Sequence, residues 1–287
     1  MSGPLLVARG VSRRFGTLAA VDEVSMRVEA GEVVGLLGAN GAGKTTLMRL
    51  LLGLLPVTEG AVQMLGGAPS RSRRRRIGYL PQNLGLYRDM TLRENLAFVG
   101  AAYGTGAPRL PDDLVDEADV LVGALPLGTQ RRGAFVAALS HRPEAVLLDE
   151  PTSGVDALAR ARLWDTIREQ SDQGVGVLVT THYLQEAQQC DRLLLLSQGR
   201  LVAQGSERDI VGGTRAWAVR TRDWASAFSA LDRAGLPVTL DGRAVRVAGS
   251  SVEAVRAALA GTPPDARIEP VPATIEERML VLARGRS

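Results

Sequence analysis

The chain has 287 residues, of which 45% are apolar, and this length predicts roughly two domains with largely aliphatic cores. Its net charge of +3 is smaller than the charge of the five arginines at positions 71 and 73–76 alone. The chain is therefore not a generally basic nucleic-acid binder, and we expect no nucleic acid partner. Cys190 is the only cysteine, which excludes an internal disulfide and suits a reducing cytoplasm.

The sequence contains no evident segment for entering a membrane. Its first residues lack a charged region followed by an apolar core, so we expect no secretion signal. The richest apolar stretch, 47–55, is interrupted by Arg49 and is too short for a bilayer core of about 30 Å. Any membrane role is therefore expected to come through a partner. The arginine run at 71–76 could contact anionic lipid or RNA, or it could be a solvated loop and strand start.

Strands and helices alternate along most of the chain. The predicted elements are strands at 5–8, 24–28 and 32–37, a helix at 45–51, a strand at 77–80, a mostly helical stretch at 92–121 broken at 104–108, a strand at 145–148, a helix at 157–170, a strand at 176–179, and a hairpin of 193–196 and 200–203. The runs 145–148 and 176–179 are continuously apolar, which is typical of parallel strands covered on both faces. The alternation predicts an α/β fold.

A glycine-rich segment between the strand at 32–37 and the helix at 45–51 contains the only lysine of the chain, Lys44, against thirty-three arginines. A loop that wraps phosphates has room for a compact ammonium but not for a wide guanidinium. The segment matches G-x-x-x-x-G-K-[ST], in which backbone N–H groups and the lysine hold phosphate oxygens and the hydroxyl of Thr45 can ligate Mg²⁺. The residues predicted to bind nucleotide here are Gly38, Ala39, Asn40, Gly41, Ala42, Gly43, Lys44, Thr45 and Thr46.

Polar residues follow two of the apolar strands. Asp149 and Glu150 end the strand at 145–148, where Asp149 could hold Mg²⁺ through water and Glu150 could polarise an attacking water. His182 ends the strand at 176–179, at the carboxyl edge where a nucleotide would bind, and could contact the γ-phosphate. His141, which precedes Arg142 and Pro143 in a loop, is interpreted as structural.

These motifs, taken together and in this order, closely resemble the ATPase subunits of ABC transporters. The resemblance covers about 5–206 and includes the phosphate loop, Gln82 after Tyr79-Leu80-Pro81, the run Leu148–Thr152, the run Ser153–Asp156, and His182. It implies a P-loop NTPase fold, with a RecA-like parallel sheet, an antiparallel β subdomain and a helical subdomain. It also implies that ATP and Mg²⁺ are the cofactors.

The resemblance assigns roles to individual residues. Phe15 would stack on adenine, Gln82 would help to hold Mg²⁺ and sense a permease, and Glu150 would be the general base. Asp156 would cross a dimer interface, and His182 would be the switch at the γ-phosphate. Thr45, Gln82 and Asp149 would form the metal site.

The chain departs from the family in two places. Where the family has Leu-Ser-Gly-Gly-Gln, this sequence has Leu125-Pro126-Leu127-Gly128-Thr129, so that proline and leucine replace the serine and the first glycine. The resemblance implies that Gly128 still contacts the nucleotide of the opposite subunit. Pro126 offers neither a hydroxyl nor an N–H, although proline suits a first helical turn. This departure leaves a low-turnover regulatory subunit as an alternative. Gln82 and Gly128 are only 46 positions apart, so we expect a shortened helical subdomain.

A boundary is predicted at Gly212 and Gly213, which gives an ATP-binding domain at 1–211 and a small α+β domain at 215–287. The predicted elements of the small domain are strands at 216–221, 243–248 and 267–271 and helices at 224–234, 252–260 and 274–282. Its order of elements and the segment 272–279 resemble the C-terminal extension of drug-exporter ATPases.

The subfamily resemblance implies a bacterial ABC-2-type exporter subunit, peripheral on the cytoplasmic face of the membrane, that binds a separate permease. It would pair with itself or with a homologue. A soluble ABC ATPase acting on ribosomes or DNA is a further alternative, which the single phosphate loop and the absence of a heptad run disfavour. The sequence does not name a transported compound.

Overall fold

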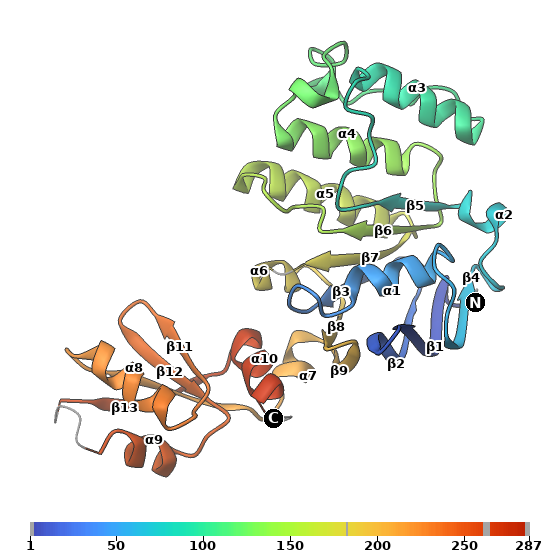
Figure 1. The fold of residues 1–287 in the computed structure, drawn as a ribbon. Helices are drawn as coiled ribbons and strands as arrows, with labels where there is room; N and C mark the ends of the chain where they lie inside the picture. Colours follow the sequence, from blue (N-terminus) through green and yellow to red (C-terminus); the bar gives the residue numbers. More distant parts are fainter. Residues whose placement is uncertain (1–2, 182, 261–264, 285–287) are drawn as a thin grey trace. The chain divides into compact units, whose positions relative to one another are not determined.

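A computed structural model describes residues 3–181, 183–260 and 265–284 (Figure 1). The chain divides into two compact units, Met1–Gln204 and Gly205–Ser287. The strands of the first unit are β1 (Leu6–Phe15), β2 (Leu18–Val28), β3 (Val33–Leu37), β4 (Glu59–Met64), β5 (Ile77–Leu80), β6 (Ala145–Asp149), β7 (Gly176–Thr181), β8 (Arg192–Ser197) and β9 (Arg200–Gly205, which ends at the boundary). Its helices are α1 (Lys44–Leu51), α2 (Arg71–Arg74), α3 (Leu92–Tyr103), α4 (Leu127–Leu139), α5 (Ala157–Asp172) and α6 (Leu184–Ala187).

A six-stranded sheet in the order β5-β6-β7-β3-β8-β9 organises the first unit, and its first five strands run parallel. Side chains of β6 alternate between two cores. Ala145 and Leu147 pack with α1 and the antiparallel strands, whereas Val146 and Leu148 pack with α4 and α5. Strands buried on both faces need no polar alternation, which is why these runs are continuously apolar. The α/β prediction is confirmed.

A three-stranded antiparallel sheet, in the order β2-β1-β4, covers one face of the main sheet together with α1. The helical part of the unit lies at the other end of the main sheet, where α4 packs against α3 and β5 (Figure 1). The nucleotide-binding architecture expected from the sequence, with parallel, antiparallel and helical parts, is therefore present.

Of the mostly helical stretch predicted over 92–121, the part before the predicted break at 104–108 is helical, but the part beyond residue 108 is not. Between α3 and α4 the only helical segments of the described backbone are short 3-10 turns, at Asp112–Leu114 and Val122–Ala124. The segment between them returns to the start of α3, where the N–H groups of Leu92 and Arg93 donate to the carbonyls of Val120 and Ala118. Its backbone thus satisfies donors that a helix start leaves free.

Three parallel strands end at one edge of the main sheet. Leu37 of β3 pairs with Thr181 of β7, and Asp149 of β6 pairs with Thr180. The segments that follow β3 and β6 therefore emerge side by side. The carboxyl edge of a parallel sheet, where such segments gather, is where α/β folds bind ligands.

The second unit contains a four-stranded antiparallel sheet in the order β11-β12-β10-β13. Its elements are α7 (Glu207–Val211), β10 (Arg215–Arg220), α8 (Trp224–Arg233), β11 (Val238–Asp241), β12 (Ala244–Ala248), α9 (Val252–Ala258), β13 (Arg267–Pro272) and α10 (Ile275–Arg284). Helices α8 and α9 pack on one face through Val219, Leu231, Val245 and Val255. The strand β11 was not predicted, because its outer position leaves two of its four residues exposed and the other two only partly buried, which weakens the apolar signal.

The two units divide between Gln204 and Gly205, seven residues before the predicted end of the first domain. The difference arises from α7, which packs against α10 and whose Ile210 carbonyl accepts a hydrogen bond from Arg278. Helix α7 therefore belongs to the second unit. Its start is marked by a capping box between Ser206 and Asp209.

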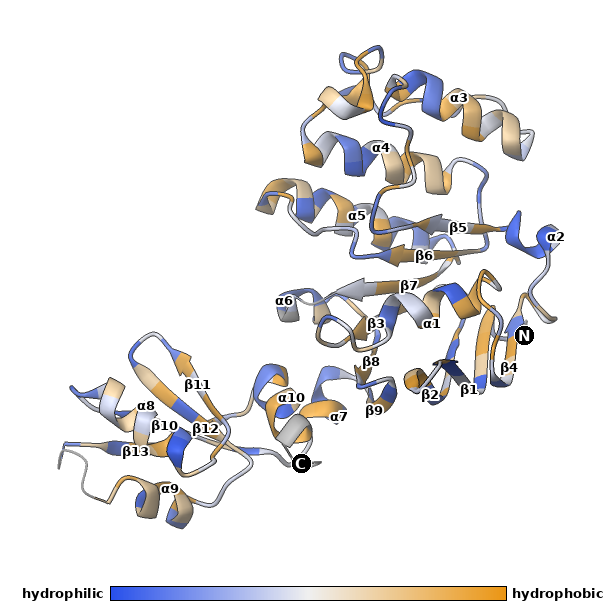
Figure 2. Ribbon diagram, viewed as in Figure 1, coloured by the Kyte–Doolittle hydropathy of each residue, from blue (hydrophilic) through white to orange (hydrophobic). Residues whose placement is uncertain are grey.

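Within the residues that the structure describes, no helix is long and apolar enough to cross a membrane. The arginine run forms the hydrophilic helix α2 and the residues after it (Figure 2). Arg74 and Arg75 donate to the backbone carbonyls of Leu52 and Tyr103, and Arg76 pairs with Glu144.

Candidate functional site

The loop between β3 and α1 takes a backbone conformation that requires glycine at two positions. Gly38 has φ +159° and Gly43 has φ +103°, the latter in the left-handed region at the N-cap of α1. A Cβ on Gly38 would lie 2.4 Å from the Leu196 carbonyl oxygen, and one on Gly43 would lie 2.3 Å from the Ala20 carbonyl oxygen. The loop therefore lies tightly against β8 and β2, and the start of α1 faces the space that it encloses.

Lys44 is buried beneath this loop. Its Nζ donates to the carbonyl oxygens of Gly38 at 2.7 Å and Ala39 at 3.2 Å. Burial lowers the pKa of Lys44 below its usual range, and the charges of Glu150 and Asp149 partly offset this effect. The ammonium is thus already drawn inside the loop, close to two carboxylates. The loop also closes through the Ala42 N–H, which donates to the Ala39 carbonyl.

Asp149 lies next to the loop, although 104 positions separate it from Thr45. The Thr45 hydroxyl donates to Asp149 Oδ2 at 2.8 Å, and the Thr180 hydroxyl donates to Asp149 Oδ1 at 2.7 Å. Both carboxylate oxygens of this buried residue are therefore held in place. The predicted pairing of the loop with the end of β6 is present as a direct hydrogen bond.

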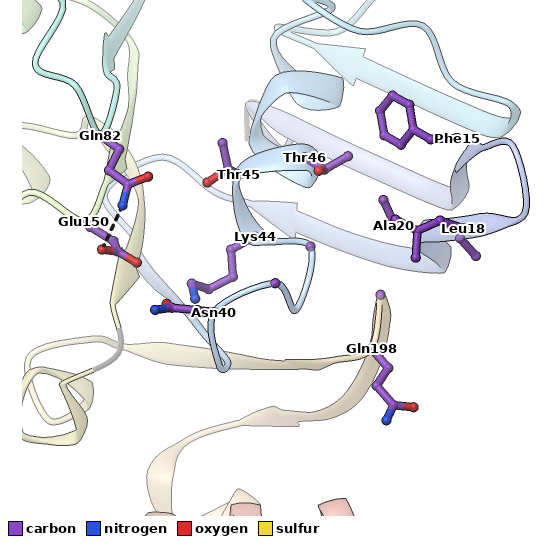
Figure 3. A pocket seen from close by; sticks show the side chains of 14 residues that line it. Phe15, Leu18, Ala20, Asn40, Lys44, Thr45, Thr46, Gln82, Glu150 and Gln198 are labelled. Atoms are coloured by element: carbon purple, nitrogen blue, oxygen red, sulfur yellow. Dashed lines mark hydrogen bonds between the residues drawn. The ribbon is translucent and has the colours of Figure 1, made fainter.

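Glu150 follows Asp149 with a left-handed backbone, φ +51°. Its N–H donates to the Thr180 hydroxyl at 2.8 Å, and its carbonyl accepts from Arg131 Nη1 at 2.9 Å. Gln82, after β5, donates from Nε2 to Glu150 Oε2 at 3.4 Å, a long hydrogen bond. The two side chains thus approach each other at one wall of the site (Figure 3).

Lys44, Thr45, Gln82 and Glu150 line a cavity of about 650 Å³, whereas the buried Asp149 is not among its lining residues. Phe15, which is 45% exposed, lies across the cavity from Gln82 and Glu150 (Figure 3). The Arg13 guanidinium lies over the Phe15 ring, 4.6 Å from its centroid. The predicted residues lining the cavity are Phe15, Asn40, Gly41, Gly43, Lys44, Thr45, Thr46, Gln82 and Glu150.

Five lining residues were not predicted: Leu18, Ala19 and Ala20 on β2, and Gln198 and Gly199 in the β8–β9 turn. The turn itself was predicted as a hairpin, but nothing in its sequence shows that it reaches the phosphate loop. The Gly199 N–H donates to the Ala42 carbonyl, a contact that only the sheet order creates. Arg131 was likewise missed as a neighbour of Glu150, because α4 and β6 meet only in the folded chain.

Gly128 and Asp156 do not line this cavity. Gly128 is in the first turn of α4, and Asp156 is the exposed N-cap of α5, where its Oδ1 accepts from the Ala159 N–H at 2.9 Å. That hydrogen bond lowers the pKa of Asp156. Pro126 is the N-cap of α4 rather than a residue of its first turn, and it offers no side-chain cap.

The predicted site residue His182 lies outside the described residues. His141, interpreted as structural, stacks on Tyr103 at 3.8 Å between ring centroids, and its Nε2 lies 3.1 Å from the Ile77 carbonyl oxygen. Burial lowers its pKa, which keeps the ring neutral.

The groups at the cavity fit a nucleoside triphosphate with a divalent cation. Among the described residues, no three His, Cys, Asp or Glu side chains gather into a metal cluster. The Thr45 hydroxyl, Asp149 and Gln82 nevertheless provide hard oxygen ligands next to a phosphate-sized loop. This set suits Mg²⁺, which usually keeps water and substrate phosphate among its ligands.

Comparisons with known proteins show the family of the chain. The ABC transporter family profile matches residues 21–153. The chain is 37% identical over 72% of its length to the Escherichia coli "Probable multidrug ABC transporter ATP-binding protein YbhF", of which the match spans only 38%. It is 40% identical to the Burkholderia lata "Nod factor export ATP-binding protein I", with 71% of each chain covered.

Among solved structures, one titled "Structure of ATP binding subunit of ABC transporter" superimposes with a TM-score of 0.67 and 30% identity. This match covers 72% of the present chain and 91% of the other. The phosphate loop, the Thr45–Asp149 contact and these similarities lead to one conclusion: the chain belongs to the ATP-binding subunits of ABC transporters and is an ATPase.

Proposed function

We propose that this chain hydrolyses ATP to power an ABC-2-type exporter through a separate membrane permease. It would act as a homodimer or heterodimer, peripheral on the cytoplasmic face of a bacterial membrane. Two relatives are named for multidrug transport and Nod factor export, which supports an exporter of this kind. The observation that carries the ATPase part is that Lys44, Thr45 and Glu150 line one cavity, with Asp149 hydrogen-bonded to the Thr45 hydroxyl.

Each wall of the cavity has a proposed task. Lys44 would neutralise β/γ oxygens, for which it is already desolvated, and Mg²⁺ held near Thr45, Gln82 and Asp149 would neutralise further phosphate charge. Glu150 would orient and deprotonate the attacking water. The face of the Phe15 ring not covered by Arg13 would stack on adenine.

A second ATPase subunit would complete the site. The family resemblance implies that Gly128 and Asp156 bind nucleotide. In the structure they lie at the starts of α4 and α5 and do not line the cavity. They would therefore meet the nucleotide of the partner subunit. Pro126 weakens that contact, since it has no N–H or hydroxyl. This specific feature supports the second candidate function, a low-turnover regulatory subunit.

The permease would bind the helical part of the first unit. Tyr87 and Phe98 are each 51% exposed and form an edge-to-face pair with ring centroids 5.4 Å apart. Val115 and Leu121 are exposed as well, in the segment that returns to α3. Exposed apolar side chains on one subdomain are typical of a protein interface.

The test is co-purification with the membrane protein encoded by the neighbouring reading frame. The variant Tyr87→Ser with Phe98→Ser should lose the permease and keep its ATPase activity as an isolated subunit, because neither ring lines the cavity. Leu240→Ser, at a comparably exposed leucine of the second unit, is the control and should keep the permease. Undiminished co-purification of the double variant would contradict the docking surface. The lack of any membrane protein in that reading frame would contradict the exporter assignment.

A further inference from the structure

Glu150 has a backbone conformation that needs outside support. Its φ of +51° lies in the left-handed region, which non-glycine residues adopt uncommonly and at a cost in free energy. The peptide on its N-terminal side is held by the Thr180 hydroxyl, which accepts the Glu150 N–H. The orientation of the carboxylate depends on this backbone, because the side chain extends from it. A group that holds the other peptide therefore acts on the carboxylate.

Arg131 is that group. Its Nη1 donates to the Glu150 carbonyl at 2.9 Å and to the Pro151 carbonyl at 3.4 Å. The residue comes from α4, and its side chain reaches across to the segment after β6 although only 6% of the residue is exposed. Two consecutive carbonyls bound by one planar group leave the turn little freedom to rotate.

The burial of this guanidinium is costly, which argues that its position matters. Burial lowers the pKa of Arg131, while the charge of Glu150 acts in the opposite direction. Its Nε, also buried, has no hydrogen-bond partner among the described residues. A residue that only filled space between α4 and β6 could be apolar and would avoid this cost.

We propose that Arg131 is a positioning residue for hydrolysis. By binding the carbonyl of Glu150 it keeps the carboxylate directed at the cavity, and it ties the base to α4, the helix that follows Pro126. This inference rests on the proposed role of Glu150 as the general base. Arg131 does not line the cavity, so it acts through Glu150 rather than on the nucleotide.

The proposal predicts a division between turnover and binding. Arg131→Met keeps the length of the side chain and removes every donor, so kcat for ATP hydrolysis should fall by about 10-fold to 100-fold, the usual effect of losing a hydrogen bond from a charged group. The KM for ATP and the affinity for a fluorescent ATP analogue should change by less than about 3-fold, because the binding loop is untouched. Arg131→Lys keeps a charged donor without the fork and should have an intermediate kcat.

Arg132→Met is the matched control, since this neighbouring arginine pairs with Asp113 and not with the Glu150 carbonyl. Its kcat should stay near that of the natural protein. All variants are compared by thermal melting first, and if Arg131→Met fails to fold, Arg131→Lys carries the test. An undiminished kcat in the folded Arg131 variants, or an equal loss in Arg132→Met, would overturn the inference. A higher KM for ATP with an unchanged kcat would overturn it as well.

Glu150→Gln, measured in parallel, separates the two assignments. If it hydrolyses ATP normally, the general base is another residue and the role of Arg131 falls with it. If it is inactive while Arg131→Met turns over normally, only the positioning role is wrong. If Arg131→Met hydrolyses ATP slowly but binds it normally, and Glu150→Gln is inactive, both the general base and the positioning role are supported.

Discussion

The start of α4 offers a direct test of whether dimer closure limits turnover. Replacing Pro126 with Ser and Leu127 with Gly gives this segment the first four residues of the family signature, Leu-Ser-Gly-Gly. In the structure Pro126 is the N-cap, with φ −56° and ψ 146°, and its carbonyl accepts the Gln130 N–H at 3.0 Å. Serine is a preferred N-cap residue, and its hydroxyl could accept the Thr129 N–H, which proline cannot match.

The two changes should partly cancel in stability. The new cap is worth about 1 kcal/mol. Glycine in place of Leu127 costs about 1 kcal/mol in helix propensity, and the buried part of this leucine, which is 43% exposed, adds about 1 kcal/mol. A net change within about 1 kcal/mol shifts the melting temperature by no more than about 4 °C in a protein of this size. Because Pro126 lies outside the helix, its substitution should not disrupt the start of α4.

The effect on ATP turnover should be much larger. The serine supplies a hydroxyl and an N–H, and a hydrogen bond to a charged phosphate contributes about 1.5–3 kcal/mol. If closure of the dimer is rate-limiting, phosphate release should rise by about 10-fold to 100-fold. The same pair of changes in a Glu150→Gln background should strengthen the ATP-bound dimer seen by gel filtration.

Pro126→Ala with Leu127→Gly provides the comparison, since it gains the N–H without the hydroxyl and should show a smaller increase. If the serine variant melts normally and yet shows neither faster turnover nor a tighter ATP-bound dimer, the segment does not limit the cycle. The reasoning from the missing hydrogen bond would then be refuted.

Three further outcomes are expected. Lys44→Ala should abolish ATP turnover in a phosphate-release assay, because the chain has no other lysine to bind the phosphates. Turnover at the rate of the natural protein would contradict the phosphate-loop assignment. Glu150→Gln should bind the fluorescent ATP analogue normally and hydrolyse ATP at least about 100-fold more slowly, and normal hydrolysis would assign the base elsewhere. In the second unit, burial raises the pKa of Glu277, but hydrogen bonds from Arg246 and Thr274 outweigh it, and the net pKa is lowered. The stabilisation contributed by the Arg246–Glu277 pair should be fully present above the ordinary glutamate pKa of about 4.3. It should be lost as the pH falls through the lower pKa that Glu277 has in the folded protein. Glu277→Gln should cost about 3 kcal/mol at pH 7, and a melting-temperature difference that does not shrink on acidification would contradict the ion pair.

The sequence predicted the main elements and most of the cavity lining because these signals are local. The glycines and Lys44 occur within eight consecutive residues, and the phosphate loop they form depends mainly on their own backbone geometry. Continuous apolar strands such as 145–148 identified a sheet buried on both faces. The stretch 109–121 was misread as helical because its apolar residues pack beside α3 without forming a helix of their own.

Contacts between residues distant in the chain could not be predicted from such local signals. Nothing local indicates that the turn at Gln198 and Gly199 borders the nucleotide cavity, or that Arg131 reaches the carbonyl of Glu150. Both follow from the order of strands in the sheet and from the packing of α4 on it.

The sequence by itself determined the chemistry of this protein: a phosphate loop with one lysine, two carboxylates after an apolar strand, and a proline in place of the signature serine. Only the tertiary structure decided how these groups are held. Thr45 meets Asp149 because β3 and β6 flank β7 in parallel, so that their ends share one edge. Glu150 keeps its left-handed backbone because Thr180 and Arg131, distant in the chain, bind its two peptides. Residue types set what a group can do, whereas sheet order and helix packing set what it touches.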